Sequence, residues 1–332
     1  MTDTLFLSSD DVTDLAKPAD YVAAVREGYC QRGEGAPAQP RSKFFRTDPV
    51  GMLTSYAAVL PDTGAMGGYM YTAGFGAEDA WFMTPLFDAD SGAPLALLDG
   101  ASMNPHKTGA AGAVAIDELA REDSTTLAVI GSGAQARGQL RATATVREFD
   151  EVRVYSPTPE SREAFAVDFD DELAADVRAV DSSDAAVSGA DVVITATRAS
   201  EPVFDGETLD PGTHVTAMGQ YSPEKRELDT TTIERATYVP DLRDRATFDS
   251  GEFLLAVQEG AVTEGDIHAE LGEIVAGEAP GRTSDDQITV FDSGGTGIET
   301  VAAAYMLYER AVREDVGRTI EFAPASDALT GN

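Results

Sequence analysis

The feature that most constrains this chain is a glycine-rich turn between an apolar run and a helical segment. Residues 126–130, Thr-Leu-Ala-Val-Ile, are typical of a short strand buried on both faces. The turn that follows, 131–136, reads Gly-Ser-Gly-Ala-Gln-Ala and fits the pattern G-x-G-x-x-G/A. In that pattern the first glycine makes the tight turn, the second lets the backbone approach a pyrophosphate, and the last small residue packs the helix on the strand. The N–H groups at the start of the helix favour phosphate. The stretch therefore predicts dinucleotide binding, with an ordinary strand-turn-helix as the alternative.

The charge of the chain is strongly negative. Asp and Glu total 58 against 24 Lys and Arg, which gives a net charge of −34. Such a chain repels nucleic acid and anionic membranes, so we expect neither as a partner. The acidic residues are spread along the whole chain, which indicates a solvated surface and argues against an acidic tail. Because salt screens self-repulsion, this composition is typical of a protein adapted to high salt, and a halophilic protein is expected.

Length and residue types narrow the class further. A chain of 332 residues has room for two domains with sizeable cores. No apolar run reaches the roughly 20 residues that span a membrane, and no basic region precedes an apolar one at the N-terminus. The single cysteine, Cys30, excludes an internal disulfide, and the three histidines show no metal-ligand spacing. A cytoplasmic protein without a metal site is therefore predicted.

The order of the expected elements divides the chain in two. Residues 1–118 form a mixed α+β unit, which a helix over 296–312 within about 294–322 is expected to complete, and residues 119–293 alternate strand and helix. That alternation predicts an α/β fold with a doubly wound parallel sheet of the Rossmann type. Residues 323–332 are expected to be a disordered tail. The strands predicted for the two parts are 51–60, 66–73, 80–88 and 94–98, and then 126–130, 152–155, 177–180, 191–195, 214–218, 237–240 and 288–291.

Several motifs, taken together and in order along nearly the whole chain, resemble those of the ornithine cyclodeaminase/mu-crystallin family. They are Ser91 to Gly100 (similar to T-G-x-P-L-A-x-x-D-G), Lys107 to Ala111 (R-T-[AG]-A-A), Leu127 to Ala136 (L-x-[VI]-[IV]-G-x-G-x-Q-A), Pro223 to Leu228 (P-x-K-x-E-L), Glu270 to Glu273 (E-L-G-E), Gly281 to Thr283 (G-R-[ST]) and Phe291 to Gly295 (F-x-S-x-G).

The resemblance implies a homodimer whose N-terminal unit binds substrate and makes the dimer contact, with a Rossmann NAD(P)-binding domain behind it. It also implies an NAD(P)-dependent enzyme, which acts at the C–N bond of a small amino or imino acid by deamination or imine reduction. The family includes ornithine cyclodeaminases, alanine dehydrogenases and ketimine reductases. A non-catalytic protein that binds NAD(P) and a small ligand, as mu-crystallins do, is the alternative.

The residues that the resemblance places around the substrate depart from the family pattern. Arg41 is the candidate for the first arginine on the substrate carboxylate, with Arg46 as its competitor, and Lys107 stands where the second arginine would be. A lysine offers a point charge in place of a bidentate fork. Tyr69 replaces the catalytic lysine of G-x-K, and Tyr221 replaces the catalytic aspartate that lies four residues before Lys225.

Tyrosines at the two catalytic positions bear on the direction of reaction. A phenol has a pKa near 10, so it donates a proton more readily than it accepts one at neutral pH. Tyr221 is therefore expected to favour imine reduction over oxidative deamination, unless the site has lost its chemistry and kept only its ligand. Tyr221, Lys225 and Tyr69 form the predicted catalytic group. Ser293 and Gly294 are expected to close over cofactor or substrate.

The remaining site residues are expected to hold the dinucleotide. At the end of the second strand, where NAD enzymes usually carry an acid, the chain has Ser156, and Arg162 follows. This favours NADP over NAD. The predicted cofactor contacts are Thr108, Gly131, Ser132, Gly133, Ala134, Gln135, Ser156, Arg162, Thr197, Ala217, Met218 and Gly219.

Overall fold

The computed structural model describes residues 2–75 and 79–330 and divides into two compact units. One unit comprises Met1–Lys107 with Thr296–Asn332, and the other comprises Thr108–Gly295. We refer to them as unit 1 and unit 2. The sequence-based boundary was placed at residue 118, whereas the division falls inside helix α3 (Met103–Leu119). A long helix shared by two units carries no loop signal at the boundary, which is why the sequence placed it later.

Unit 1 is built on a seven-stranded sheet in which only β1 and β6 run parallel. The four strands predicted for this region each lie within one residue of an observed strand. The other three strands, which begin at Thr2, Ser42 and Arg318, were not predicted. The first and the last of them pair with each other across segments some 300 residues apart. The strand order is β14 (Arg318–Phe322), β1 (Thr2–Leu7), β6 (Pro94–Asp99), β5 (Ala80–Asp88), β4 (Ala65–Gly74), β3 (Val50–Leu60), β2 (Ser42–Thr47).

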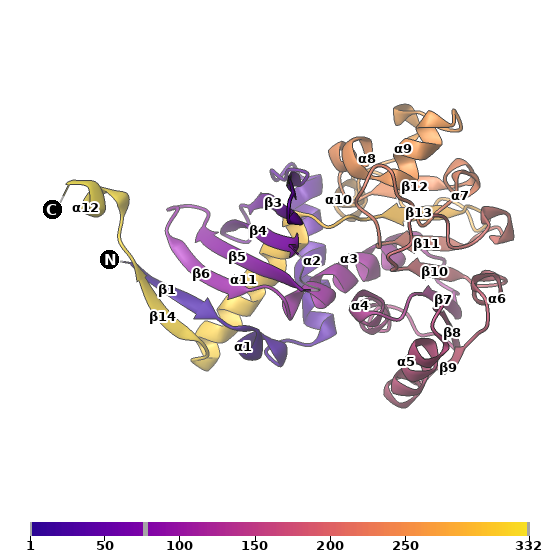
Figure 1. Ribbon diagram of the computed structural model, residues 1–332, viewed down its shortest axis with the longest axis horizontal. Helices are drawn as coiled ribbons and strands as arrows, with labels where there is room; N and C mark the ends of the chain where they lie inside the picture. Colours follow the sequence, from indigo (N-terminus) through magenta and orange to yellow (C-terminus); the bar gives the residue numbers. More distant parts are fainter. Residues whose placement is uncertain (1, 76–78, 331–332) are drawn as a thin grey trace. The chain divides into compact units, whose positions relative to one another are not determined.

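Helices cover one face of this sheet, which we call the inner face. Helix α11 (Gly297–Glu314) lies across β3 and β4 and packs against α2 (Pro18–Gly33), as Figure 1 shows. A capping box starts α11, because Thr296 accepts from the helix start while Glu299 accepts from the Thr296 N–H at 2.6 Å. Helix α1 (Ser9–Thr13) precedes α2. The expected disordered tail instead carries a short helix, α12 (Ala325–Thr330), while residues 331–332 lie outside the described residues.

Unit 2 has the predicted doubly wound architecture. Its seven strands are all parallel, and each lies within one residue of a strand expected from the sequence. Seven α-helices lie between or beside these strands (Figure 1): α4 (Ala134–Thr143), α5 (Pro159–Glu172), α6 (Ser183–Val187), α7 (Thr230–Arg235), α8 (Arg243–Asp249), α9 (Gly251–Gln258) and α10 (Leu271–Val275). The strand order is β12 (Thr237–Pro240), β13 (Thr289–Asp292), β11 (His214–Ala217), β10 (Val192–Thr195), β7 (Thr126–Ile130), β8 (Glu151–Tyr155), β9 (Asp176–Ala179).

Both faces of this sheet are buried. Along β7, Leu127 and Val129 belong to one hydrophobic cluster, whereas Ala128 and Ile130 belong to the cluster on the opposite face. Strands buried on both sides leave only the sheet ends open to a ligand. The chain runs outward in opposite directions from β7 and β10, so the topological switch point lies between them. In open α/β sheets, ligands bind at the carboxyl ends of the strands at this point.

Candidate active site

The glycine-rich turn lies at the switch point and has the backbone that its sequence predicts. Gly131 follows β7 with a φ of 123°, a region that L side chains rarely adopt. A Cβ atom there would lie 2.4 Å from the carbonyl oxygen of Ala196, in the segment after β10. Only glycine therefore fits at the first position of the turn.

The second glycine leaves space in front of a helix. Gly133 is the N-cap of α4 (Ala134–Thr143), and a Cβ atom placed on it meets no atom within 4 Å. Ser132, Gly133 and Ala134 are half-buried or exposed, while Ala136 is fully buried against the strand. The turn thus presents backbone N–H groups to an open space at a helix N-terminus, which is what a pyrophosphate needs. The residues present fit a dinucleotide.

The end of β8 carries hydroxyl groups and a guanidinium. The hydroxyl of Ser132 lies 3.1 Å from that of Ser156, which brings the glycine-rich turn and the end of β8 together. Arg162, on α5 (Pro159–Glu172), donates to the Ser156 carbonyl oxygen at 3.0 Å and to the exposed carboxylate of Asp181 at 2.8 Å. Two residues that the sequence assigned to the cofactor, Ser156 and Arg162, are therefore in contact.

A buried carboxylate that the sequence did not single out joins the ends of β10 and β11. Glu227 accepts from the N–H of Thr197 at 2.6 Å and from the N–H of Gly219 at 2.7 Å, and also from the Thr195 hydroxyl at 3.0 Å. Burial raises the pKa of Glu227, although these donors act in the opposite direction. Thr197 and the segment from Ala217 to Gly219 are therefore held together at the carboxyl ends of β10 and β11. The glutamate of P-x-K-x-E-L was the available signal.

The loop after β11 carries the predicted catalytic Tyr221 and Lys225. Tyr221 is 36% exposed and Lys225 is exposed, and a turn is closed by the Lys225 N–H donating to the Ser222 carbonyl at 3.1 Å. Both side chains thus lie on the surface of unit 2 at the carboxyl end of the sheet. The predicted Ser293 and Gly294 follow β13 at the same end.

Unit 1 gathers the other predicted residues into a cluster of aromatic rings and cations on the inner face. The Arg41 guanidinium lies 5.3 Å from the centre of the Tyr56 ring and donates to the Tyr71 hydroxyl at 3.3 Å. The Lys107 ammonium lies 5.1 Å from the centre of the Tyr69 ring. The competitor Arg46 is exposed and donates to the Asp48 carbonyl oxygen instead. We call Arg41, Tyr56, Tyr69, Tyr71, Phe82 and Lys107 the aromatic cluster.

Lys107 lies inside α3, which begins at Met103, because a proline such as Pro105 is tolerated in the first turn. Its side chain is 1% exposed and forms a buried ion pair with Glu299 at 3.4 Å. The sequence did not indicate this partner, which lies on α11. Thr108, the next residue, accepts at its carbonyl oxygen from the Gln139 side chain at 2.9 Å.

The side chain of Tyr69 is fixed within the aromatic cluster by a hydrogen bond and by ring stacking. Its hydroxyl donates to the Gly100 carbonyl oxygen at 3.1 Å, and its ring stacks on Phe82 with 5.3 Å between the centres. Burial raises the pKa of Tyr69 far above its usual range, so the phenol stays protonated. With its proton engaged by a backbone carbonyl, Tyr69 presents its ring to Lys107. A direct part for its hydroxyl in proton transfer stays a prediction.

The described part of the chain contains neither a group of metal ligands nor a membrane-spanning helix. Over residues 2–75 and 79–330, no three His, Cys, Asp or Glu side chains are grouped so that they could hold a metal ion. In the same ranges, no helix has the length and apolar character needed to cross a membrane.

A doubly wound sheet with a dinucleotide turn at its switch point, joined to a unit with buried cations, defines a dinucleotide-linked enzyme. Residues 3–315 match the ornithine cyclodeaminase/mu-crystallin family, and the chain belongs to that family. It is 40% identical over 238 residues to Delta(1)-pyrroline-2-carboxylate reductase of Bacillus cereus, covering 71% of this chain and 73% of the relative.

Solved structures of relatives match the fold of this chain over nearly its full length. The Thermococcus litoralis Delta(1)-pyrroline-2-carboxylate reductase in complex with NADH and L-proline matches with a TM-score of 0.91 at 32% identity, covering 96% of this chain and all of that one. An archaeal alanine dehydrogenase dimer with bound NAD matches with a TM-score of 0.90 at 32% identity, covering 97% of this chain and 100% of that one. The predicted family, fold class and enzymatic nature are confirmed.

Proposed function

We propose that this enzyme reduces a small cyclic 2-imino acid to the corresponding amino acid with a reduced nicotinamide cofactor. The observation that carries the direction is the pair of tyrosines, Tyr69 and Tyr221, where the family pattern has a lysine and an aspartate. A phenol is a poor base, but it can supply the proton that imine reduction requires. The reductase relatives from Bacillus cereus and Thermococcus litoralis support the same direction.

Each unit has a separate part in this proposal. In unit 1, Arg41 and Lys107 hold the substrate carboxylate, because both are buried cations on the same aromatic cluster. Arg41 supplies a planar fork and Lys107 a point charge. In unit 2, Tyr221 donates a proton to the imine nitrogen, and Lys225 lies on the same loop after β11. A reduced nicotinamide held by unit 2 would supply the hydride that, together with this proton, converts C=N to CH–NH.

Residues of unit 2 fit the parts of the dinucleotide. Gly131, Ser132 and Gly133 with the first residues of α4 would hold the pyrophosphate, and Thr197 with Ala217 to Gly219 would line the nicotinamide. Ser156 and Arg162 would hold the adenosine ribose. The two solved neighbours contain NADH and NAD. For this chain we propose NADPH as the preferred cofactor, because a guanidinium suits a 2′-phosphate and Asp181, its exposed partner, is easily displaced.

A substrate panel tests this function. Five- and six-membered cyclic 2-imino acids, and pyruvate with ammonia, are mixed with NADPH or NADH at low and at molar KCl, and nicotinamide absorbance is followed. We expect oxidation of NADPH with at least one cyclic imino acid and weaker activity with pyruvate and ammonia. If the protein binds the cofactor but oxidises it with no member of the panel, the alternative of a non-catalytic binding protein is favoured.

We further propose that a second copy of the chain covers the outer face of the unit 1 sheet. This face carries Phe44, Leu53, Met70, Trp81, Met83 and Phe87, whose exposed fractions run from 36% to 71%. Register places them on one side, since Phe44 pairs with Leu53 and Met70 with Met83. So large an apolar face is typical of a protein interface. The archaeal alanine dehydrogenase, matched over 97% of this chain, is a dimer.

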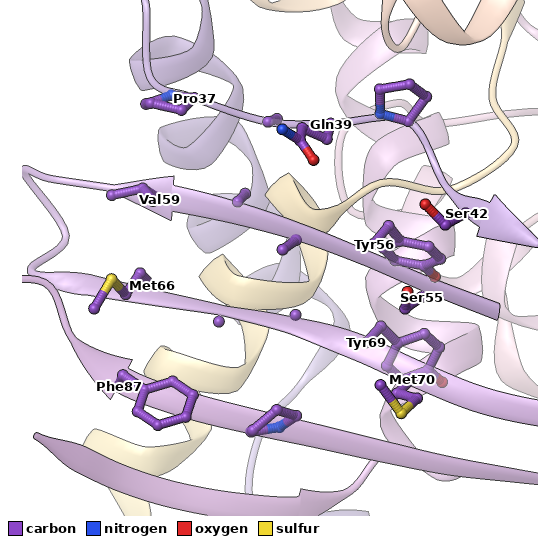
Figure 2. Close-up of a pocket in the computed structure, with 17 residues that line it drawn as sticks. Pro37, Gln39, Ser42, Ser55, Tyr56, Val59, Met66, Tyr69, Met70 and Phe87 are labelled. Atoms are coloured by element: carbon purple, nitrogen blue, oxygen red, sulfur yellow. The ribbon is translucent and has the colours of Figure 1, made fainter. Parts of the chain in front are cut away.

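A hollow in the same sheet continues this outer face. It has a volume of about 570 Å³ and is bounded by the segment from Pro37 to Pro40 and by Val59, Met66 and Phe87 on neighbouring strands (Figure 2). We propose that apolar side chains of the second copy seat there. The test is the mass in solution of Trp81→Glu with Met83→Glu: we expect a monomer. Val167→Glu, an exposed apolar position on α5, is the matched control. A dimer that persists in the double variant would contradict this interface.

The cytoplasm is the compartment that we propose for this enzyme, because a reductase needs a supply of reduced nicotinamide cofactor.

A further inference from the structure

Unit 2 contains a buried charge cluster at the carboxyl ends of β12 and β13 that the proposed reaction does not use. Arg245, on α8 (Arg243–Asp249), is 1% exposed. Because its guanidinium is shielded from solvent, it needs counter-charges within the protein. Its Nε donates to Asp241 Oδ1 at 2.5 Å, and its Nη2 lies 2.9 Å from Asp292 Oδ1. A third carboxylate, that of Asp249, lies 3.5 Å from Nη1. All three acids are buried.

Such a cluster is poorly explained by stability alone. Removing several charges from water is unfavourable, and the attraction between them offsets this only when the geometry is good. Buried ion pairs can, however, specify one conformation of the chain around them.

Asp241 links the cluster to the loop after β13, because its second oxygen is directed at that loop. Asp241 Oδ2 accepts from the Ser293 hydroxyl at 3.0 Å, from the Gly294 N–H at 2.9 Å and from the Gly295 N–H at 3.2 Å. One carboxylate therefore binds three successive residues of the loop. Its other oxygen is occupied by Arg245 and by the Leu242 N–H at 2.7 Å.

Arg245 also fixes the start of the same loop. Its Nη2 donates to the carbonyl oxygen of Asp292, the last residue of β13, at 2.8 Å. A Cβ atom on Gly294 would lie 3.0 Å from two atoms of the Arg245 side chain, so the guanidinium and its stem lie directly against the loop. The loop has two glycines and only one side chain long enough to anchor it. Its conformation is thus imposed by Asp241 and Arg245.

We infer that Asp241 is a positioning residue for the Ser293–Gly295 loop and that Arg245 holds Asp241 in the orientation this requires. The inference rests on the proposed function in one respect, which is that Ser293 and Gly294 lie over the cofactor or substrate when these bind. Arg245 acts through Asp241 and through the Asp292 carbonyl oxygen, and it is not assigned a contact with a reacting atom. Its effect is on how well the loop is prepared for binding.

The test compares Arg245→Lys with Arg243→Lys. Lysine keeps the buried charge but cannot bridge Asp241 and Asp292 as the guanidinium does. Arg243 is two residues away on α8, is half exposed and pairs with Glu273, so it is the matched control. Hydrogen exchange is measured by mass spectrometry on a peptide spanning residues 291–297, together with the melting temperature, the dissociation constant of NADPH and the kinetics of imine reduction.

We expect the Gly294 and Gly295 amides in Arg245→Lys to exchange about tenfold faster. The amides of β11 and of the glycine-rich turn (131–136) should keep their protection. The KM for the imino acid should rise and kcat/KM should fall about tenfold to a hundredfold, as for a misplaced binding group. Arg243→Lys should behave as the wild type. A purely structural role would instead lower the melting temperature and loosen all of α8 and β13, with KM unchanged, and that result would overturn the inference.

Two further outcomes keep the proposals separate. If Arg245→Lys does not fold, Ser293→Ala removes one of the three loop donors without touching the buried charges, and it should give a smaller change in the same two readouts. Unchanged exchange and KM in Ser293→Ala would then overturn the inference. If the wild type reduces no imino acid but the loop exchange in Arg245→Lys rises as expected, the positioning role stands and the proposed function fails.

Discussion

The ammonium of Lys107 and the carboxylate of Glu299 form an ion pair of 3.4 Å with both side chains fully buried. The two residues lie 192 positions apart, on α3 and α11. Glu299 also accepts from the N–H of Thr296 and so helps to start α11. A single carboxylate therefore pairs with Lys107, the cation that we propose binds the substrate carboxylate, and also fixes the beginning of a helix.

Glu299→Gln should destabilise the protein strongly, because it removes the carboxylate that pairs with the buried Lys107 ammonium. We expect the free energy of unfolding to fall by about 3–5 kcal/mol, the usual result of breaking a buried pair from one side. The double variant Glu299→Gln with Lys107→Met should recover much of that loss. Urea unfolding measures both, and exposed Lys17→Met is the control. A double variant no more stable than Glu299→Gln would mean that the ion pair is not the cause.

Gly133→Val should abolish dinucleotide binding while the protein stays folded. A Cβ atom at this position meets no protein atom within 4 Å, so the side chain is accommodated in the free protein, but it enters the space that the pyrophosphate needs. Fluorescence titration with NADPH and NADH measures the loss. Gly265→Val, at another glycine with room for a side chain, should bind as the wild type does. Unchanged affinity in Gly133→Val would contradict the cofactor assignment.

Arg162→Ala should change cofactor preference more than activity. The guanidinium is expected to meet the 2′-phosphate of NADPH, so its loss should raise the KM for NADPH about tenfold or more and leave the KM for NADH nearly unchanged. Arg178→Ala, which removes a surface arginine paired with Glu151, is the control. The two cofactors are compared by steady-state kinetics. Equal effects on NADPH and NADH would remove the argument for NADPH.

Tyr221→Phe should lower kcat for imine reduction and leave the dissociation constant of the cofactor nearly unchanged, because a lost proton donor acts mainly in the transition state. A fall of about a hundredfold is typical for a general acid. Tyr221→Asp should shift the balance towards oxidative deamination. The half-buried Tyr305→Phe is the control. If Tyr221→Phe reduces every substrate at the wild-type rate, Tyr221 has no catalytic part.

Stability should rise with KCl from dilute buffer to molar concentrations. The chain carries a net charge of −34, and added ions screen the repulsion among its carboxylates. The melting temperature followed over this range, with the denaturant midpoint as a second measure, tests the expectation. A melting temperature that is flat or decreases with KCl would argue against adaptation to high salt.

Local signals accounted for most of the strands but not for the contacts between elements. The strand at residues 126–130 and the conformations of the fingerprint glycines were predictable, because apolar runs and glycines report on the backbone nearby. The strands β1, β2 and β14 were not predicted: β1 and β14 pair with each other across almost the whole chain, and β2 and β14 are the edge strands of their sheet. Lys107 was recognised as unusual, but its burial inside α3 was not.

The sequence by itself determined the family, the doubly wound sheet and the position of the dinucleotide turn, because these depend on residue types at short spacings. Only the tertiary structure decided which charges are compensated. Glu299 beside Lys107, Glu227 across the ends of β10 and β11, and Asp241 with Arg245 under the Ser293–Gly295 loop all belong to pairings that a linear pattern cannot display. In a chain with 58 acidic residues, composition marks nearly all of them as surface. Burial alone distinguishes the few that hold the site together.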